Sequence, residues 1–111
     1  MSWTAVCSVA DIPPNAGVAA LLHGKQIALF KIDTQVFALD NYDPFSEANV
    51  LSRGIVGSIG DELVIASPIY KQHFTLANGR CIEDETQSIS TYSVKLDGDT
   101  VMVGIADQAA A

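Results

Sequence analysis

Short runs of β-prone residues, each ended by residues that favour turns, constrain the fold of this chain more than any other feature. The dipeptide Asn78-Gly79 separates two such runs and is the strongest short-range signal for a β-hairpin. Strands are expected over residues 3–7, 18–22, 26–32, 36–39, 63–65, 71–76, 80–82, 90–96 and 100–105. The pattern therefore predicts an all-β domain of stacked antiparallel sheets.

The segment from Asp40 to Gly60 interrupts this pattern. It contains Pro44, Gly54 and Gly57 and has only weak periodicity, so an irregular connection with one short helical turn at residues 46–51 is expected. A loop of about 20 residues is unusually long for a compact β domain, and loops of that length usually carry function.

The length of 111 residues fits one domain, which we place at residues 1–106, with a frayed tail at 107–111. A hydrophobic share of 49% and a charged share of 17% exclude a disordered chain. No apolar run reaches the roughly 18 residues of a membrane-spanning helix. The start of the chain lacks the features of a secretory signal, so we expect a cytoplasmic protein in which Cys7 and Cys81 are reduced thiols.

The charge balance is acidic, with 6 Lys and Arg against 13 Asp and Glu and a formal net charge of −7. Nucleic-acid binding depends on basic residues that neutralise phosphates, so this composition argues against a nucleic-acid partner. It also argues against binding to an anionic membrane surface.

No catalytic constellation is visible in the chain. Ser67 and His73 could belong to a triad, but Ser67 stands before a proline in ordinary turn chemistry and lacks a Gly-x-Ser-x-Gly elbow. His23 falls in a predicted turn, and Glu83 and Glu85 fall in an acidic loop that we expect to be solvated. We therefore predict no catalytic residue in this chain.

Two loops in the middle of the chain resemble those of a Rieske domain, in which Cys-x-His and Cys-Pro-x-His loops hold a [2Fe–2S] cluster. The first loop here reads Asp-Asn-Tyr-Asp-Pro from residue 40, and the second reads Ser-Pro-Ile-Tyr from residue 67. The resemblance places Asn41 and Asp43 at the first ligand pair, and Ser67 and Tyr70 at the second. It extends over nearly the whole chain and implies a Rieske-like fold.

None of these four residues can replace its counterpart as a cluster ligand. A Rieske cluster requires two thiolates on one iron and two imidazoles on the other. Amide, carboxylate, hydroxyl and phenol oxygens do not replace soft thiolates or imidazole nitrogens. A weak hard-cation site is conceivable, but it would have only one carboxylate. Hydrogen bonds between the two loops are the expected use of these side chains, and no cofactor or metal is predicted in this chain.

Residues 49–57 and 66–74 also resemble the small subunit of the bacterial NAD(P)H-dependent assimilatory nitrite reductase, a Rieske-like family in which many members lack the ligands. The resemblance implies a non-catalytic small subunit, inactive alone, within a cytoplasmic complex that reduces nitrite to ammonium. The partner would be a large subunit carrying flavin (FAD), an iron–sulfur cluster and sirohaem.

Two other functions remain open from the sequence. A Rieske-type ferredoxin would carry electrons to an oxygenase, and its preparations would be brown and contain iron. A Rieske-fold binding module would serve another complex, and its gene would not neighbour that of a sirohaem-type reductase.

The same loops are the candidate docking face for the large subunit. The basic candidates are three of the six basic residues of the chain, and they would steer association: Arg53, Lys71 and Arg80. The apolar candidates would serve as buried anchors: Tyr42, Phe45, Ile69 and Tyr70. The alternative is that these apolar side chains fill a small core of the loops themselves.

Overall fold

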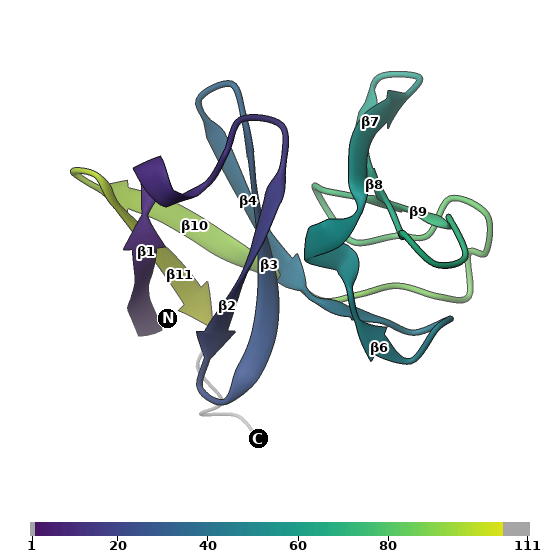
Figure 1. The fold of residues 1–111 in the computed structure, drawn as a ribbon, viewed down its shortest axis with the longest axis horizontal. Helices are drawn as coiled ribbons and strands as arrows, with labels where there is room; N and C mark the ends of the chain where they lie inside the picture. Colours follow the sequence, from purple (N-terminus) through teal and green to yellow (C-terminus); the bar gives the residue numbers. More distant parts are fainter. Residues whose placement is uncertain (1, 106–111) are drawn as a thin grey trace.

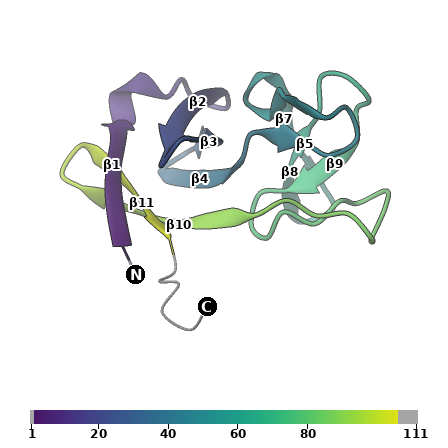
Figure 2. The same ribbon diagram turned by 90° about the horizontal axis from the view of Figure 1, so that it is seen from below.

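Two groups of strands make up the part of the chain that the computed structural model describes, residues 2–105 (Figures 1 and 2). One group is a six-stranded sheet, the large sheet, with the order β1-β11-β10-β4-β3-β2. Its strands are β1 (Ser2–Ser8), β2 (Gly17–Leu22), β3 (Lys25–Ile32), β4 (Gln35–Asp40), β10 (Thr91–Asp97) and β11 (Thr100–Ile105). Every pairing is antiparallel, and the 3-10 helix η1 (Val9–Asp11) follows β1.

The other group lies within residues 41–90, here named the loop region. It contains the hairpin of β5 (Tyr42–Asp43) and β6 (Ala48–Asn49), and the 3-10 helix η2 (Leu51–Arg53). It also contains the three-stranded sheet β7-β8-β9, formed by β7 (Ile55–Ile59), β8 (Glu62–Ala66) and β9 (His73–Thr75). The prediction of an all-β domain built from antiparallel sheets is confirmed.

Strands β3 and β4 form a wall between two hydrophobic cores. Ile27 and Leu29 of β3 face the core inside the large sheet, whereas Ala28 and Phe30 face the core beneath the loop region. Successive side chains of a strand point to opposite faces, and all four residues are buried. A strand buried on both faces needs a continuous apolar run, which is the sequence found at residues 27–30.

The two cores have separate members. The core within the large sheet consists of Ile12, Leu22, Ile27, Leu29, Ala38, Val101 and Val103. The core of the loop region consists of Ala28, Phe30, Leu39, Leu51, Ile65, Phe74, Leu76, Cys81 and Ile89.

The thiols of Cys7 and Cys81 are free, and desolvation raises the pKa of both.

The structure corrects the prediction of an irregular segment over residues 40–60. The segment holds β5, β6, η2 and β7, and the expected helical turn at 46–51 is wrong. Glu47 has a φ of 56°, and its left-handed backbone lets the chain reverse so that Asp43 pairs with Ala48. Strand β7 escaped prediction because Gly57 and Ser58 weaken its alternation of apolar and polar residues.

The predicted hairpin at Asn78-Gly79 is only partly formed. Strand β9 ends at Thr75, and the expected strand over 80–82 is reduced to an isolated bridge between Phe74 and Cys81. Gly79 has a φ of 75° in a wider turn, where its N–H donates to the carbonyl of Thr75 at 2.8 Å. A Cβ at residue 79 would lie 2.0 Å from the carbonyl oxygen of Ile89, so this close approach requires glycine.

Two other predictions concern the ends of the chain and membranes. The tail predicted to fray, residues 107–111, lies outside the described residues. Within residues 2–105, no helix has both the length and the hydropathy that crossing a bilayer requires.

Candidate functional site

The two loops that resemble the Rieske ligand loops lie against each other. The first follows β4 and includes β5, and the second follows β8 at Ser67. The Ser67 hydroxyl donates a hydrogen bond to Asp43 Oδ2 at 2.5 Å, and both residues are fully buried. As the sequence predicts, a side-chain hydrogen bond therefore joins the two loops.

Asp43 is the centre of this contact. Its Oδ2 also accepts a hydrogen bond from the Ser46 hydroxyl at 2.9 Å, and its Oδ1 accepts one from the Phe45 N–H at 2.9 Å. The three donors come from both loops and satisfy the carboxylate inside the protein, as a buried charged group requires. With its oxygens occupied in this way, Asp43 serves as a structural acceptor.

Asn41 makes a separate set of contacts. Its Oδ1 accepts a hydrogen bond from the Ser52 N–H at 2.7 Å. Its Nδ2 donates to Gln26 Oε1 at 3.0 Å and to the Asn49 carbonyl at 3.3 Å. The buried amide thus fastens η2 and β6 to the start of β3, which no local sequence signal could reveal.

Tyr70 lies apart from the other three residues. Tyr70 is 60% exposed, and its neighbours Ile69 and Lys71 are exposed as well. Lys71 has a φ of 64°, a left-handed conformation that is uncommon for a residue other than glycine, asparagine or aspartate. The second loop therefore places Ile69, Tyr70 and Lys71 in solvent while Ser67 anchors its base.

This geometry does not fit a [2Fe–2S] cluster. The resemblance assigns Asp43 and Ser67 to different irons, yet their oxygens are 2.5 Å apart and share a hydrogen bond, so no iron or sulfide fits between them. The fourth position, Tyr70, is exposed. Within residues 2–105, no group of three or more His, Cys, Asp or Glu side chains could hold a metal ion.

The candidate docking residues fall into two groups. Arg53, Lys71, Ile69 and Tyr70 are exposed, and Tyr42 is 40% exposed. Phe45 is half-buried and lies against the core residue Phe74, with ring centroids 6.1 Å apart.

Arg80 is also engaged within the chain, because its Nη2 lies 3.2 Å from Glu62 Oε1. Glu62 begins β8, whereas Ser67 follows the other end of that strand, so Arg80 lies away from the second loop. Phe45 and Arg80 thus already have partners in the fold.

A polar contact that the sequence did not predict joins β9 to the acidic loop. Glu83 was expected to be solvated, but its Oε1 accepts a hydrogen bond from the His73 N–H at 2.7 Å, and its Oε2 lies 2.5 Å from His73 Nδ1. Desolvation raises the pKa of Glu83, but the hydrogen bonds from His73 outweigh it, so the net pKa is below the ordinary value. The pair holds residues 82–85 against β9, whereas the Ser67 hydroxyl is bonded to Asp43 and not to His73.

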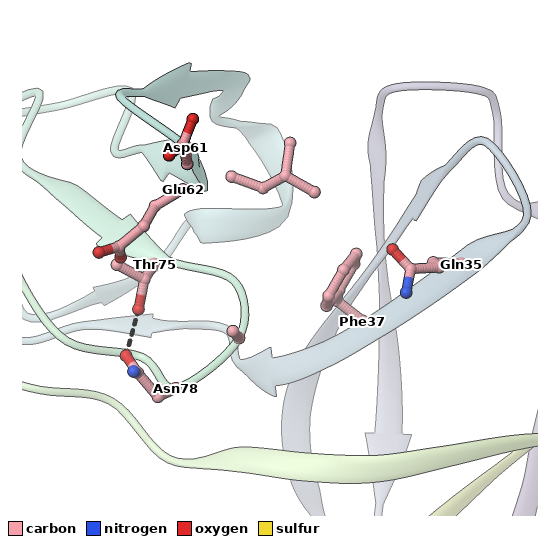
Figure 3. A pocket seen from close by; sticks show the side chains of 8 residues that line it. Gln35, Phe37, Asp61, Glu62, Thr75 and Asn78 are labelled. Atoms are coloured by element: carbon pink, nitrogen blue, oxygen red, sulfur yellow. Dashed lines mark hydrogen bonds between the residues drawn. The ribbon is translucent and has the colours of Figure 1, made fainter.

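A cavity of about 380 Å³ lies between the start of β4 and the β7–β8 turn (Figure 3). Gln35 and Phe37 form one side, and the other side is formed mainly by Asp61, Glu62 and Asn78. The Thr75 hydroxyl in its lining donates a hydrogen bond to Asn78, and Glu62 forms an ion pair with Arg80.

Comparisons with known proteins also relate this chain to Rieske-like domains. The family described as Rieske-like [2Fe–2S] domain matches residues 2–104. The NADH nitrite reductase small subunit of Salmonella typhimurium strain LT2 is 44% identical over 103 residues, which cover 91% of this chain and 95% of that subunit. The chain belongs to the family of nitrite reductase small subunits.

A solved member of the family has the same fold. The solution structure of the nitrite reductase [NAD(P)H] small subunit from Erwinia carotovora superposes with a TM-score of 0.82 at 48% identity. The match covers 97% of this chain and 85% of that one. The predicted family and fold are confirmed.

A related segment also occurs within a longer protein. The nitrite reductase [NAD(P)H] large subunit of Klebsiella oxytoca is 46% identical over 102 residues, which cover 92% of this chain. The chain spans only 11% of the length of that large subunit. A segment similar to this whole chain therefore lies within the polypeptide of that large subunit.

Proposed function

We propose that this chain is a non-catalytic subunit of an NAD(P)H-dependent nitrite reductase in the cytoplasm and that it binds the large subunit. The observation that carries the proposal is the buried hydrogen bond between Ser67 and Asp43, which joins the loops where a Rieske protein would hold its cluster. A Rieske-like fold without cluster ligands cannot carry electrons through a cluster, so its function must depend on its surface. Binding a partner protein is the simplest such function.

The Klebsiella oxytoca protein supports the proposal that the large subunit is the partner of this chain. Its large subunit contains a segment 46% identical to this chain, so the two parts work there at the high effective concentration of a single polypeptide. A separate small subunit must reach the same contact by its own affinity. The partner would carry FAD, an iron–sulfur cluster and sirohaem, whereas this chain would carry no cofactor and would be inactive alone.

Anaerobic incubation of the chain with iron and sulfide tests the cofactor part of this proposal. Absorption and electron paramagnetic resonance spectra should show no stoichiometric [2Fe–2S] centre, because no thiolate or imidazole stands at the four ligand positions. A reduced-state signal from a bound centre would contradict the proposal and favour a ferredoxin function.

The docking surface we propose is the exposed part of the two loops: Ile69, Tyr70, Lys71, Tyr42 and Arg53. Aromatic and arginine side chains dominate the energetics of interfaces, and the basic groups would steer association. Gly54 packs closely on Ala66, with a would-be Cβ 2.2 Å from the Ala66 carbonyl oxygen, so Arg53 lies at the same end of β8 as the second loop. Phe45 and Arg80 are expected to contribute less because both have partners within the chain.

Co-purification with the large subunit tests this surface. Tyr70→Ala and Lys71→Glu should each weaken binding about tenfold or more, because they remove an anchor and reverse a steering charge. Lys95→Glu, on β10 of the large sheet, is the matched control and should leave binding unchanged. If both loop variants bind as the wild type does and Lys95→Glu does not, the docking surface lies on the large sheet.

A further inference from the structure

Strand β7 is an unprotected edge of the loop region. It pairs with β8 on one side, and no strand within residues 2–105 pairs with its other side. Its sequence, Ile-Val-Gly-Ser-Ile, contains no charge, no proline and no bulge, which are the devices that usually block an exposed edge. Figure 1 shows the β7–β8 turn at the upper end of the loop region, and its residue Asp61 lines the cavity that separates this turn from the start of β4.

The same strand exposes apolar side chains on one face. Ile55 is 72% exposed and Ile59 is 42% exposed, the former being the most exposed of the large hydrophobic residues. Alternation along a strand puts Ile55, Gly57 and Ile59 on this outer face, whereas Val56 packs against the core. The edge therefore combines free backbone groups with an apolar outer face.

Opposite charges stand at the two ends of this strand. Arg53 precedes it, Asp61 lies in the turn that follows it, and both are exposed. Neither makes an ion pair or hydrogen bond within the described residues through its side chain. The uncharged strand β7 is thus preceded by a positive charge and followed by a negative one.

We propose that a second copy of this chain pairs with β7 in antiparallel register about Gly57. In that register Gly57 lies opposite Gly57 of the second copy, and Ile55 lies opposite Ile59. The same two-fold symmetry places Arg53 of each copy beside Asp61 of the other, so the edge is complementary to itself in shape, polarity and charge. The two three-stranded sheets then form one continuous sheet across the dimer.

The net charge of −7 opposes association of two copies, but the local pattern favours it. Residues 54–60 carry no charge, and charges farther away than a Debye length, about 8 Å at physiological ionic strength, are largely screened. The proposal goes beyond the binding of the large subunit, because it concerns a second copy and the edge of β7. Arg53 belongs to both surfaces, so the test must separate them.

A charge swap separates them. Sedimentation velocity of the full chain over a wide concentration range should show a monomer–dimer equilibrium. Arg53→Glu and Asp61→Arg should each weaken the dimer about tenfold, because each creates two like-charge contacts across the two-fold axis. The double variant R53E/D61R should restore the wild-type dimer, because it exchanges the two charges. It should not restore binding of the large subunit that Arg53→Glu weakens, because Asp61 does not belong to the proposed docking surface.

A second variant tests the centre of the interface. A Cβ at Gly57 has no atom within 4 Å, so Gly57→Glu should keep the melting temperature of the monomer while it places two carboxylates opposite each other and abolishes the dimer. Leu21→Glu, at a residue 68% exposed on β2, an edge strand of the large sheet, is the matched control and should leave the dimer intact.

Three results would overturn the proposal. The first is a wild-type chain that stays monomeric at every concentration. The second is a dimer that Leu21→Glu disrupts and Gly57→Glu does not. The third is a monomeric wild type whose binding to the large subunit is lost in Gly57→Glu, since β7 would then receive a strand of the large subunit. Failure of self-association would leave binding of the large subunit at the loops intact, so the two proposals fail separately.

Discussion

The large sheet and the loop region are stabilised by different interactions. The large sheet has strands of 6 to 8 residues in nearly continuous register, with one irregularity between Ala5 and Cys7. The loop region has strands of 2 to 5 residues, and buried polar side chains connect them. Backbone ladders and a hydrophobic core join most strands of the first region, with a hydrogen bond from Tyr92 to Asp40 between β10 and β4. In the second region, Asn41, Asp43 and Ser67 join segments that backbone ladders do not connect.

The residues with positive φ show the same difference. In the large sheet region they are Asn15, His23 and Asp33, types that adopt the left-handed conformation more readily than most. In the loop region they are Glu47 and Lys71, which adopt it at a higher cost. The comparison indicates that the loop region keeps its backbone course through tertiary contacts and against local preference.

The largest expected effect is on the wall that both regions share. Phe30→Ala should lower the free energy of unfolding by about 4 kcal/mol, because it opens a cavity in the core of the loop region. Leu29→Ala, its neighbour on the other face of β3, should cost about 3 kcal/mol. Urea denaturation followed by tryptophan fluorescence and circular dichroism would measure both. If either variant gives two separate transitions, the two cores do not unfold cooperatively.

Asp43→Ala should have the next largest effect, about 3 kcal/mol, because it leaves the buried hydroxyl of Ser67 and the half-buried hydroxyl of Ser46 without their acceptor. Ser67→Ala removes one donor only and should cost about 1 kcal/mol. Hydrogen exchange should show that protection falls in residues 41–90 and persists in the large sheet. Equal loss of protection in both regions would show that polar contacts stabilise the whole domain.

Acid should weaken the attachment of residues 82–85 to β9. The folded-state pKa of Glu83 lies below its ordinary value of 4.5, so its contribution to stability is fully present above that pH and is lost as the pH falls through the folded-state pKa. Because the side chain is 43% exposed, solvent screening keeps this contribution under about 1 kcal/mol.

Urea unfolding of the wild type and of Glu83→Gln from about pH 6 to about pH 3 measures this contribution. The difference in unfolding free energy between the two proteins should shrink as the pH falls. A difference that stays constant would mean that the carboxylate contributes nothing through its charge.

The smallest expected effect is a gain in stability. Lys71→Gly removes the cost of a side chain in left-handed backbone, partly offset by the greater freedom of glycine in the unfolded chain, for a net gain of about 0.5 kcal/mol. The same variant should bind the large subunit more weakly, because it removes the charge from the proposed docking surface. Asp33→Gly, at a φ of 54° in the β3–β4 turn, should change stability by a few tenths of a kcal/mol without affecting binding. If Lys71→Gly is more stable and still binds the large subunit as tightly as the wild type, Lys71 does not contribute to the docking surface.

Much of the large sheet could be predicted from local patterns. Residues 100–105 form a strand over the expected range, because Val101, Val103 and Ile105 alternate and a turn with Gly98 precedes them. The strands expected at 18–22 and 26–32 likewise match β2 and β3 to within a residue. Periods of two and turn residues act over neighbouring positions, so they can be read without knowledge of the fold.

The four candidate ligand positions were also visible in the sequence, but their geometry was not. Their residue types were enough to argue against cluster chemistry, because ligand softness is a property of the side chain itself. The hydrogen bond between Asp43 and Ser67 joins residues 24 positions apart, and the contacts of Asn41 with Gln26 and Ser52 depend on how three separate segments pack.

The order of residues in the chain thus determined the strands of the large sheet, the acidity of the chain and the absence of thiolates and imidazoles in the two loops. Only the tertiary structure decided which polar side chains meet, that Tyr70 and Lys71 lie in solvent, that Glu83 binds His73, and that β7 is an open edge. The physical reason is range. Backbone preferences and side-chain chemistry act locally, whereas burial and hydrogen-bond partners are set by segments that folding brings together from distant parts of the chain.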